Sequence, residues 1–172
     1  MWYSFPDMED MPSNCTSLRS VCFTGHRELP PVRSAAYRQL VAHTEAAIRR
    51  AFDRGARRFY CGGAEGFDLL CGKLVLLENE RHLDIQLVLL LPYTGFGEAF
   101  TAQDRAELLR QKKAAEEVLY LSNHYFSGCM ALRNRQLVED ADLCIAYLRR
   151  APSGTAQTVS FAKEKGIEVE YV

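Results

Sequence analysis

The chain has 172 residues, a formal net charge of −1 and 48% hydrophobic residues, which is typical of a globular protein. A chain of this length can bury roughly 70% of its unfolded surface, so it needs neither disulfides nor a structural metal. The nearly balanced charge argues against a broad basic surface for duplex DNA or an anionic membrane, and it leaves room for a local basic pocket.

Membrane and targeting segments are not expected. No apolar run approaches the roughly 20 residues that cross a bilayer, and the longest one, 85–92, is typical of a buried strand. The stretch 1–14 is acidic and has no apolar core, so it does not resemble a secretory signal. We therefore expect a cytoplasmic protein with an N-terminal tail over 1–19 and a single domain over 20–172.

Short apolar runs alternate with longer helical patterns through the domain. A first strand is predicted at 20–24, and one apolar stripe predicts an amphipathic helix at 33–54. A second strand and helix follow at 58–61 and 65–80. The later elements are predicted as a strand at 84–91, an irregular piece at 96–100, a helix at 102–116, a strand at 118–121, a helix at 128–140, a strand at 143–147, a helix at 155–165 and a strand at 167–172.

This alternation predicts an α/β fold, namely a Rossmann-like doubly wound, mainly parallel sheet with helices on both faces. The third strand supports a parallel sheet because it is apolar at nearly every position, as in strands covered on both faces. In such folds the ligand crevice lies outside the carboxyl ends of the strands, near the point where the strand order reverses.

Three glycine-containing turns each follow a predicted strand and precede a predicted helix. They are T-G-H-R at 24–27, C-G-G-A-E-G-F-D at 61–68 and S-G-T-A-Q-T at 153–158. Because the carboxyl ends of parallel strands share one edge, these turns should meet there. Glycine lets a ligand approach the backbone, and the helix N-terminus behind each turn favours an anion. The turns therefore predict a site for a small phosphorylated ligand.

Polar side chains beside the turns fit that prediction. Ser153, Thr155 and Thr158 offer hydroxyl groups, while Arg27 and Arg133 offer fixed positive charge. Simpler roles remain open, because the glycines can be plain tight turns and the hydroxyl groups can be helix caps.

Two further groups of side chains also have two interpretations. Arg133 with Asn134 either reaches the crevice, where Asn134 reads a base or ribose, or forms an exposed polar patch. Tyr93 and Phe96, just past the third strand, either stack on a base or pack a loop.

Cysteine and histidine spacing does not indicate a metal site. The six cysteines include no C-x-x-C pair, and we expect them to be reduced core residues. The four histidines are scattered, without H-x-x-x-H or H-x-H. Neither the dinucleotide fingerprint G-x-G-x-x-G nor a P-loop occurs. The cysteines are Cys15, Cys22, Cys61, Cys71, Cys129 and Cys144.

The ordered set of motifs resembles the YpsA-like branch of the SLOG superfamily, which also holds the DprA/Smf proteins and the Lonely Guy phosphoribohydrolases. The motifs are V-C-F-T-G-H-R at 21–27, G-G-A-E-G-F-D at 62–68, L-P-Y at 91–93, Y-F-S-G-C with Arg133-Asn134, and S-G-T with Thr158. The resemblance covers roughly 20–172 and implies a Rossmann-like fold that binds a nucleotide or nucleotide-derived ligand. Carried over by residue, it implies a ligand edge of Thr24, Gly25, His26, Arg27, Gly62, Gly63, Gly66, Asp68, Arg133, Asn134, Gly154, Thr155 and Thr158, to which Ser153 is added from the turn itself.

One position departs from the Lonely Guy enzymes. Their motif P-G-G-x-G-T-x-x-E carries a glutamate that works in cleaving an N-glycosidic bond, and Thr158 stands at that position here. A hydroxyl group does not act as a carboxylate does in such a reaction. Asp68 or Glu65 would have to substitute for the glutamate.

Three functions are therefore compared. The first is a sensor or carrier for a nucleotide, NAD or an ADP-ribose-like molecule, which needs only the turns and the donors. The second is a nucleotide or nucleoside N-glycoside hydrolase. The third, by analogy with DprA, is binding of single-stranded DNA, although the balanced charge makes nucleic acid an unexpected partner. A homo-oligomer is compatible with each of them.

Overall fold

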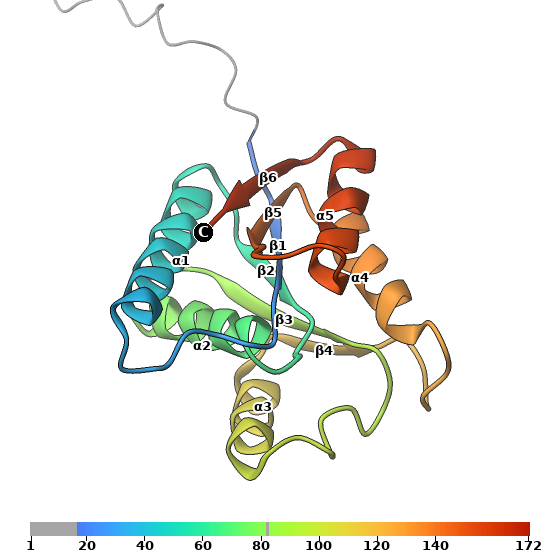
Figure 1. The fold of residues 1–172 in the computed structure, drawn as a ribbon. Coiled ribbons are helices and arrows are strands. Elements are labelled where there is room, and N and C mark those ends of the chain that lie inside the picture. Colours follow the sequence, from blue (N-terminus) through green and yellow to red (C-terminus); the bar gives the residue numbers. More distant parts are fainter. Residues whose placement is uncertain (1–16, 82) are drawn as a thin grey trace, which may run out of the picture.

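A computed structural model describes residues 17–81 and 83–172, and Figure 1 labels its helices and strands. Strands and helices alternate along the whole described chain. The strands are β1 (Ser20–Gly25), β2 (Arg58–Cys61), β3 (Gln86–Leu91), β4 (Glu117–Tyr120), β5 (Leu143–Tyr147) and β6 (Glu168–Tyr171). The helices are α1 (Ala35–Asp53), α2 (Phe67–Glu80), α3 (Ala102–Ala114), α4 (Cys129–Glu139) and α5 (Gly154–Lys165).

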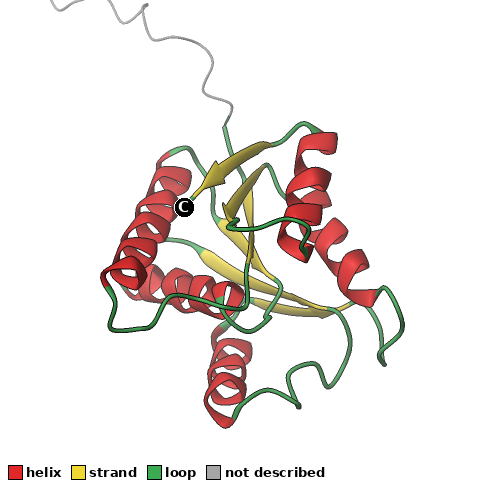
Figure 2. Ribbon diagram, viewed as in Figure 1, coloured by secondary structure: helices red, strands yellow, loops and turns green. Residues whose placement is uncertain are grey.

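The six strands form one sheet in the order β4-β3-β2-β1-β5-β6, and every neighbouring pair is parallel. The chain builds outward from β1 to β4 and then returns to place β5 on the other side of β1. Right-handed crossovers consequently put the helices of the two halves on opposite faces. The Rossmann-like doubly wound fold predicted from the sequence is confirmed (Figure 2).

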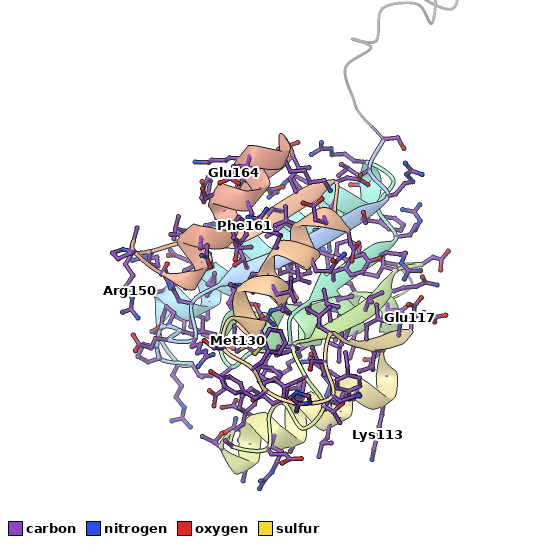
Figure 3. All side chains as sticks on the ribbon, turned by 90° about the vertical axis from the view of Figure 1, so that its right-hand side faces the viewer. Lys113, Glu117, Met130, Arg150, Phe161 and Glu164 are labelled. Carbon is purple, nitrogen blue, oxygen red and sulfur yellow. The ribbon has the colours of Figure 1, made fainter. Side chains whose placement is uncertain are left out.

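Helices cover both faces of the sheet, and an apolar core lies between the sheet and the helices on each face. Helices α1 and α2 pack on one face, with α3 against α2, while α4 and α5 pack on the other (Figures 1 and 3). Alternate residues of one strand enter the two cores: Val21 and Phe23 of β1 face α1 and α2, and Cys22 faces α4 and α5. This explains why the strands are continuous apolar runs.

The predicted element boundaries differ from the structure by one to two residues at most ends, and capping explains two of the differences. Helix α1 begins after Ser34, whose hydroxyl oxygen accepts a hydrogen bond from the Tyr37 N–H (3.1 Å). Helix α2 begins at Phe67 instead of at Glu65, because Gly66 has a positive φ of 79° that ends the preceding turn.

Packing into the core begins before the predicted domain boundary. Within the predicted tail 1–19, residues 1–16 lie outside the described residues, whereas Leu18 is 3% exposed and joins the core beneath α1. The Leu18 N–H donates to the Arg54 carbonyl (3.0 Å).

The cysteines that the structure describes are buried free thiols, at positions 22, 61, 71, 129 and 144. Cys15 lies outside the described residues. Within the described chain, none of the helices is long and apolar enough to cross a membrane.

Candidate functional site

A pocket lies at the carboxyl ends of β1 and β5, the point at which the strand order reverses. Its volume is about 390 Å³, which is within the usual range for ligand sites. The walls come from the β1–α1, β2–α2 and β5–α5 connections and from one side of α4. Figure 3 shows two wall residues at this end of the sheet, Arg150 after β5 and Met130 in the first turn of α4.

Most of the predicted ligand residues line this pocket, and some do not. Those in the wall are Thr24, Gly25, His26, Arg27, Asp68, Arg133, Asn134, Ser153, Gly154 and Thr155. Those outside the wall are Gly62, Gly63, Gly66 and Thr158, together with Glu65, one of the two candidate catalytic carboxylates. The wall residues that the sequence did not single out include Glu28, Ala64, Met130, Leu137 and Arg150.

The glycines after β1 and β2 are explained by packing within the protein. A Cβ at Gly25 would overlap the Phe67 ring, and a Cβ at Gly66 would overlap the backbone of Arg27. A Cβ at Gly62 would overlap the Arg133 guanidinium. These glycines therefore let the β1–α1 and β2–α2 connections and the Arg133 side chain of α4 approach one another closely, and they shape the pocket from behind its surface.

Gly154 differs from the other glycines because it faces open space. The nearest atom to a Cβ built there is the Asn134 Nδ2, at 4.0 Å. Gly154 therefore has no packing neighbour that requires glycine, and its backbone lies directly in the pocket wall.

Asp68 and Arg133 form a buried pair in the pocket wall. They are 6% and 4% exposed, and the Arg133 Nη1 lies 3.6 Å from the Asp68 Oδ2. Arg133 also donates from Nη1 to the Gly62 carbonyl and from Nε to the Asn134 Oδ1 (2.9 Å), while the Ala64 N–H donates to the Asp68 Oδ2 (3.3 Å). Burial places Arg133 in the crevice and excludes the exposed-patch interpretation for this side chain.

Burial has opposite effects on the two charged groups. Desolvation raises the pKa of the Asp68 carboxyl above its ordinary value, and the Arg133 charge opposes that effect. Desolvation also lowers the pKa of Arg133, and the Asp68 charge opposes that effect. Each charge therefore offsets part of the desolvation cost of the other in the pocket wall.

His26 ties the β1–α1 connection to the β5–α5 connection. Its side chain is buried, and its Nε2 accepts hydrogen bonds from the backbone N–H groups of Arg149 (2.9 Å) and Arg150 (3.3 Å). A ring nitrogen that accepts a hydrogen bond must be unprotonated, so these two hydrogen bonds require the neutral imidazole. The pKa of His26 is lowered from its ordinary value of 6.5, first by desolvation and then by the Arg150 charge.

The start of α5 presents free backbone donors to the pocket. Ser153 is the N-cap, and its Oγ accepts from the Ala156 N–H (3.0 Å). The N–H groups of Gly154 and Thr155 belong to the first turn and have no acceptor within the helix. Since both residues line the pocket, these donors and the positive end of the helix dipole are available to an anion.

Thr158 occupies a different environment from the one predicted. It is 0% exposed, lies one turn into α5, and its Oγ1 donates to the Gly154 carbonyl (2.9 Å). This hydrogen bond lies within the helix, so the hydroxyl group supports the start of α5 from behind the wall.

The aromatic residues after β3 pack mainly on each other. Phe96 is 4% exposed and meets Tyr93 edge to face, with ring centroids 5.6 Å apart, so Phe96 packs its loop and has no open face for a base. Tyr93 in turn meets Tyr125 at 5.7 Å, and 64% of Tyr125 is exposed. The sequence analysis places Tyr125 in the Y-F-S-G-C motif without assigning it a ligand role.

A second, larger cleft of about 630 Å³ lies between the 29–32 segment, α2 and α3. Its walls combine apolar residues such as Leu69 with Lys73, Glu107 and Arg110. It lies away from the β1–β5 reversal, and among the described residues no buried charged pair lines it. Across 17–81 and 83–172, histidine, cysteine, aspartate and glutamate form no group able to hold a metal ion.

Comparison with known proteins agrees with the fold. Among solved structures, DNA processing protein A (DprA) from Helicobacter pylori matches with a TM-score of 0.63 at 20% identity, over 89% of this chain and 64% of that one. DprA from Streptococcus pneumoniae matches with a TM-score of 0.64 at 16% identity, over 89% of this chain and 50% of that one. The chain thus spans less than two thirds of either DprA, and these likenesses concern the fold.

The sequence itself identifies the family. No match was found among curated proteins. The family model described as the YspA SLOG family (YpsA) matches residues 22–168, which include all five helices, strands β2 to β5, most of β1 and the first residue of β6. The chain therefore belongs to the YspA SLOG family.

Proposed function

We propose that this protein binds a nucleotide or nucleotide-derived ligand, such as a nucleoside phosphate, NAD or an ADP-ribose-like molecule, in the pocket between β1 and β5. One observation carries the proposal. The N-terminus of α5, with the unbonded N–H groups of its first turn, and the buried Asp68–Arg133 pair line the same pocket.

The phosphate would lie at the start of α5. The N–H groups of Gly154 and Thr155 can donate to its oxygens, and Arg27 and Arg150 stand on the facing connection and the rim. Arg27 is exposed and forms no ion pair among the described residues, so its guanidinium donors can reach a ligand in the pocket. Arg150 pairs with Glu28 at 3.2 Å, and both side chains are exposed enough to rearrange.

The sugar would lie at Asp68 and Asn134. An ionised carboxylate is an acceptor only, and ribose hydroxyl groups are suitable donors for it. Asn134 accepts from Arg133 through its Oδ1, which leaves its Nδ2 amide on the side of Gly154. This pocket region therefore offers both an acceptor and a donor beside the phosphate position.

Binding is a better account of the pocket than N-glycoside hydrolysis. Thr158 holds the place of the Lonely Guy glutamate, and its hydroxyl group is already bonded within α5. Glu65 does not line the pocket, which leaves Asp68 of the two carboxylates that the sequence put forward. Asp68 is paired with Arg133, and that pairing suits recognition of a polar group without chemical turnover.

Single-stranded DNA is the second candidate ligand. The DprA of Helicobacter pylori, which has a related fold, is described for its single-stranded DNA binding mode. This likeness weakens the expectation that nucleic acid is an improbable partner. Arg27, Arg149 and Arg150 near the mouth of the pocket are suitable contacts for successive phosphates.

Calorimetric titration separates these functions. Full-length protein is titrated with AMP, ADP-ribose, NAD and a single-stranded oligonucleotide, and each mixture is then chromatographed for released base. Saturable binding without release is expected for at least one mononucleotide or ADP-ribose-like compound. Binding of the oligonucleotide alone, with strong salt dependence, would replace the first candidate by the second. Release of free base would establish hydrolysis.

The matched variants are Arg27→Ala and Arg33→Ala. Both remove an exposed arginine from the same connection, but only Arg27 lines the pocket. Arg27→Ala should weaken the affinity roughly tenfold, as expected for a charge-assisted hydrogen bond. Arg33→Ala should leave the affinity unchanged. Equal effects of the two variants would mean that the ligand binds elsewhere.

A further inference from the structure

The geometry points to a stacking platform for a nucleobase at Tyr125, on the β4–α4 connection at the same edge of the sheet as the pocket. This inference rests on the proposed function, and it assigns the base end of the ligand, which the pocket wall by itself leaves open. The ligand chemistry is a purine or pyrimidine ring attached to a sugar phosphate.

Tyr125 is a large apolar ring held at the surface. It is 64% exposed, whereas most large apolar side chains of the described chain are buried. Its ring is perpendicular to that of Tyr93, with centroids 5.7 Å apart, and Tyr93 rests in the same way on the buried Phe96. The exposed ring therefore stands on a row of packed aromatic rings.

The backbone around Tyr125 is tied to its neighbours. The Thr94 N–H donates to the Ser122 carbonyl (3.0 Å), which joins the β3–α3 and β4–α4 connections. The Cys129 N–H donates to the Phe126 carbonyl (3.1 Å), and Cys129 is completely buried at the start of α4. A ring held in this way loses little conformational entropy when a base stacks on it.

The platform and the pocket share one edge of the molecule. Both connections follow the carboxyl ends of parallel strands, and Figure 1 shows them at the same end of the sheet as the start of α5. Helix α4 links the two places directly, because its first turn carries Met130 into the pocket wall and Tyr125 lies just before that turn. In this arrangement a ligand whose phosphate lies at Gly154 would extend past Asp68 and Met130 toward Tyr125, which itself stands outside the pocket wall.

Stacking is the interaction that an exposed tyrosine offers to any base. It contributes similarly for different bases, because every base has a flat π-face. The platform thus suits either a mononucleotide or one nucleotide of a single strand, and the experiment distinguishes these sources by using both.

The experiment compares ligands with and without a base. Calorimetry on the full chain measures AMP against ribose 5-phosphate, and a six-nucleotide oligo(dA) against the same strand with its bases removed. Tyr125→Ala should weaken AMP or oligo(dA) about 5- to 100-fold, the range for loss of one stacked base. It should change the affinity for the base-free partner less than twofold. Whichever base-containing ligand shows the loss is the source.

Two control variants accompany Tyr125→Ala. Tyr125→Phe keeps the ring and should keep the affinity. Tyr171→Ala removes another exposed tyrosine, 54% accessible, from β6 at the far edge of the sheet, and it should have no effect. Equal weakening of base-containing and base-free ligands by Tyr125→Ala, or no weakening of either, overturns the platform while the proposed function stands. Failure of the wild-type chain to bind either base-containing compound overturns the platform, and failure to bind ADP-ribose and NAD as well overturns the proposed function.

Discussion

The Arg133 guanidinium lies 3.6 Å from the Asp68 carboxylate, and this buried pair joins helices from opposite faces of the sheet. Asp68 belongs to the first turn of α2, and Arg133 extends from α4 past the end of β2 to reach the Gly62 carbonyl. Neither charge is stable at such a position alone, because desolvation of an unpaired ion costs several kcal/mol. The pair therefore fixes the two halves of the domain against each other at the wall of the pocket.

Removing only the cation should be strongly destabilising. Arg133→Met leaves the Asp68 carboxylate buried without a counter-charge, and we expect a loss of about 3–5 kcal/mol in the free energy of unfolding. Urea denaturation followed by circular dichroism measures it. The double variant Arg133→Met with Asp68→Asn removes both charges and should recover more than half of the loss. If the double variant is as unstable as the sum of the single variants, the two residues do not interact.

The two glycines at 62 and 154 should respond differently to the same change. Gly62→Ala places a methyl group where the Arg133 guanidinium lies, and we expect a loss of about 1–3 kcal/mol. Gly154→Ala places one in open space at a helix start, so the stability should change by less than about 0.5 kcal/mol. Thermal unfolding compares them. Similar losses in both variants would contradict the packing role assigned to Gly62.

Acid should weaken the fold through His26. Because the folded pKa is lowered from 6.5, the unfolded chain takes up the proton first as the pH falls. The contribution of His26 is thus complete above about pH 6.5 and is lost as the pH falls through the folded pKa. Glu28 opposes the shift, while Arg149 and Arg150 support it, together with burial.

The matched variant for this prediction is His26→Gln, which keeps an acceptor for the two N–H groups and does not titrate. Its free energy of unfolding, measured from pH 7.5 to 5, should fall less steeply than that of the wild type. Parallel curves for the two proteins would show that His26 does not control this part of the pH dependence.

Changes at the α5 cap can separate stability from anion binding. Ser153→Ala removes the N-cap acceptor and should cost about 1 kcal/mol of stability. Ser153→Asp keeps a good cap and should retain the stability, yet its negative charge should repel a phosphate at Gly154. Melting curves with and without ADP-ribose test both effects. Unchanged ligand affinity in Ser153→Asp would place the phosphate away from α5.

The overall fold was predictable because its signals are local. Strands buried on both faces, such as β3, are continuous apolar runs, and glycine turns separate them from amphipathic helices. Parallel alternation then requires the turns to meet at one edge. The predicted boundaries are less accurate where a side chain or a glycine decides the end of a helix, as at Ser34 and Gly66.

The sequence predicted where the pocket lies better than it predicted what each pocket residue does. The sequence singles out Gly62 and Arg133 separately, but only the tertiary structure shows that the glycine makes room for the arginine. Glu28, Met130 and Arg150 have no local motif that marks them as pocket residues, since their position depends on how three connections converge. Tyr125 likewise becomes a candidate ligand contact only through its exposure and its contact with Tyr93, which the structure shows.

Titration of ¹⁵N-labelled protein with ADP-ribose, followed by amide NMR, tests the central claim most directly. Ligand binding at the β1–β5 reversal predicts the largest saturable shifts for the Gly154 and Thr155 N–H groups. Shifts concentrated at Leu69, Lys73 and Glu107 would move the site to the cleft between α2 and α3. That result, or the absence of any saturable shift with ADP-ribose, AMP and NAD alike, would contradict the proposed function.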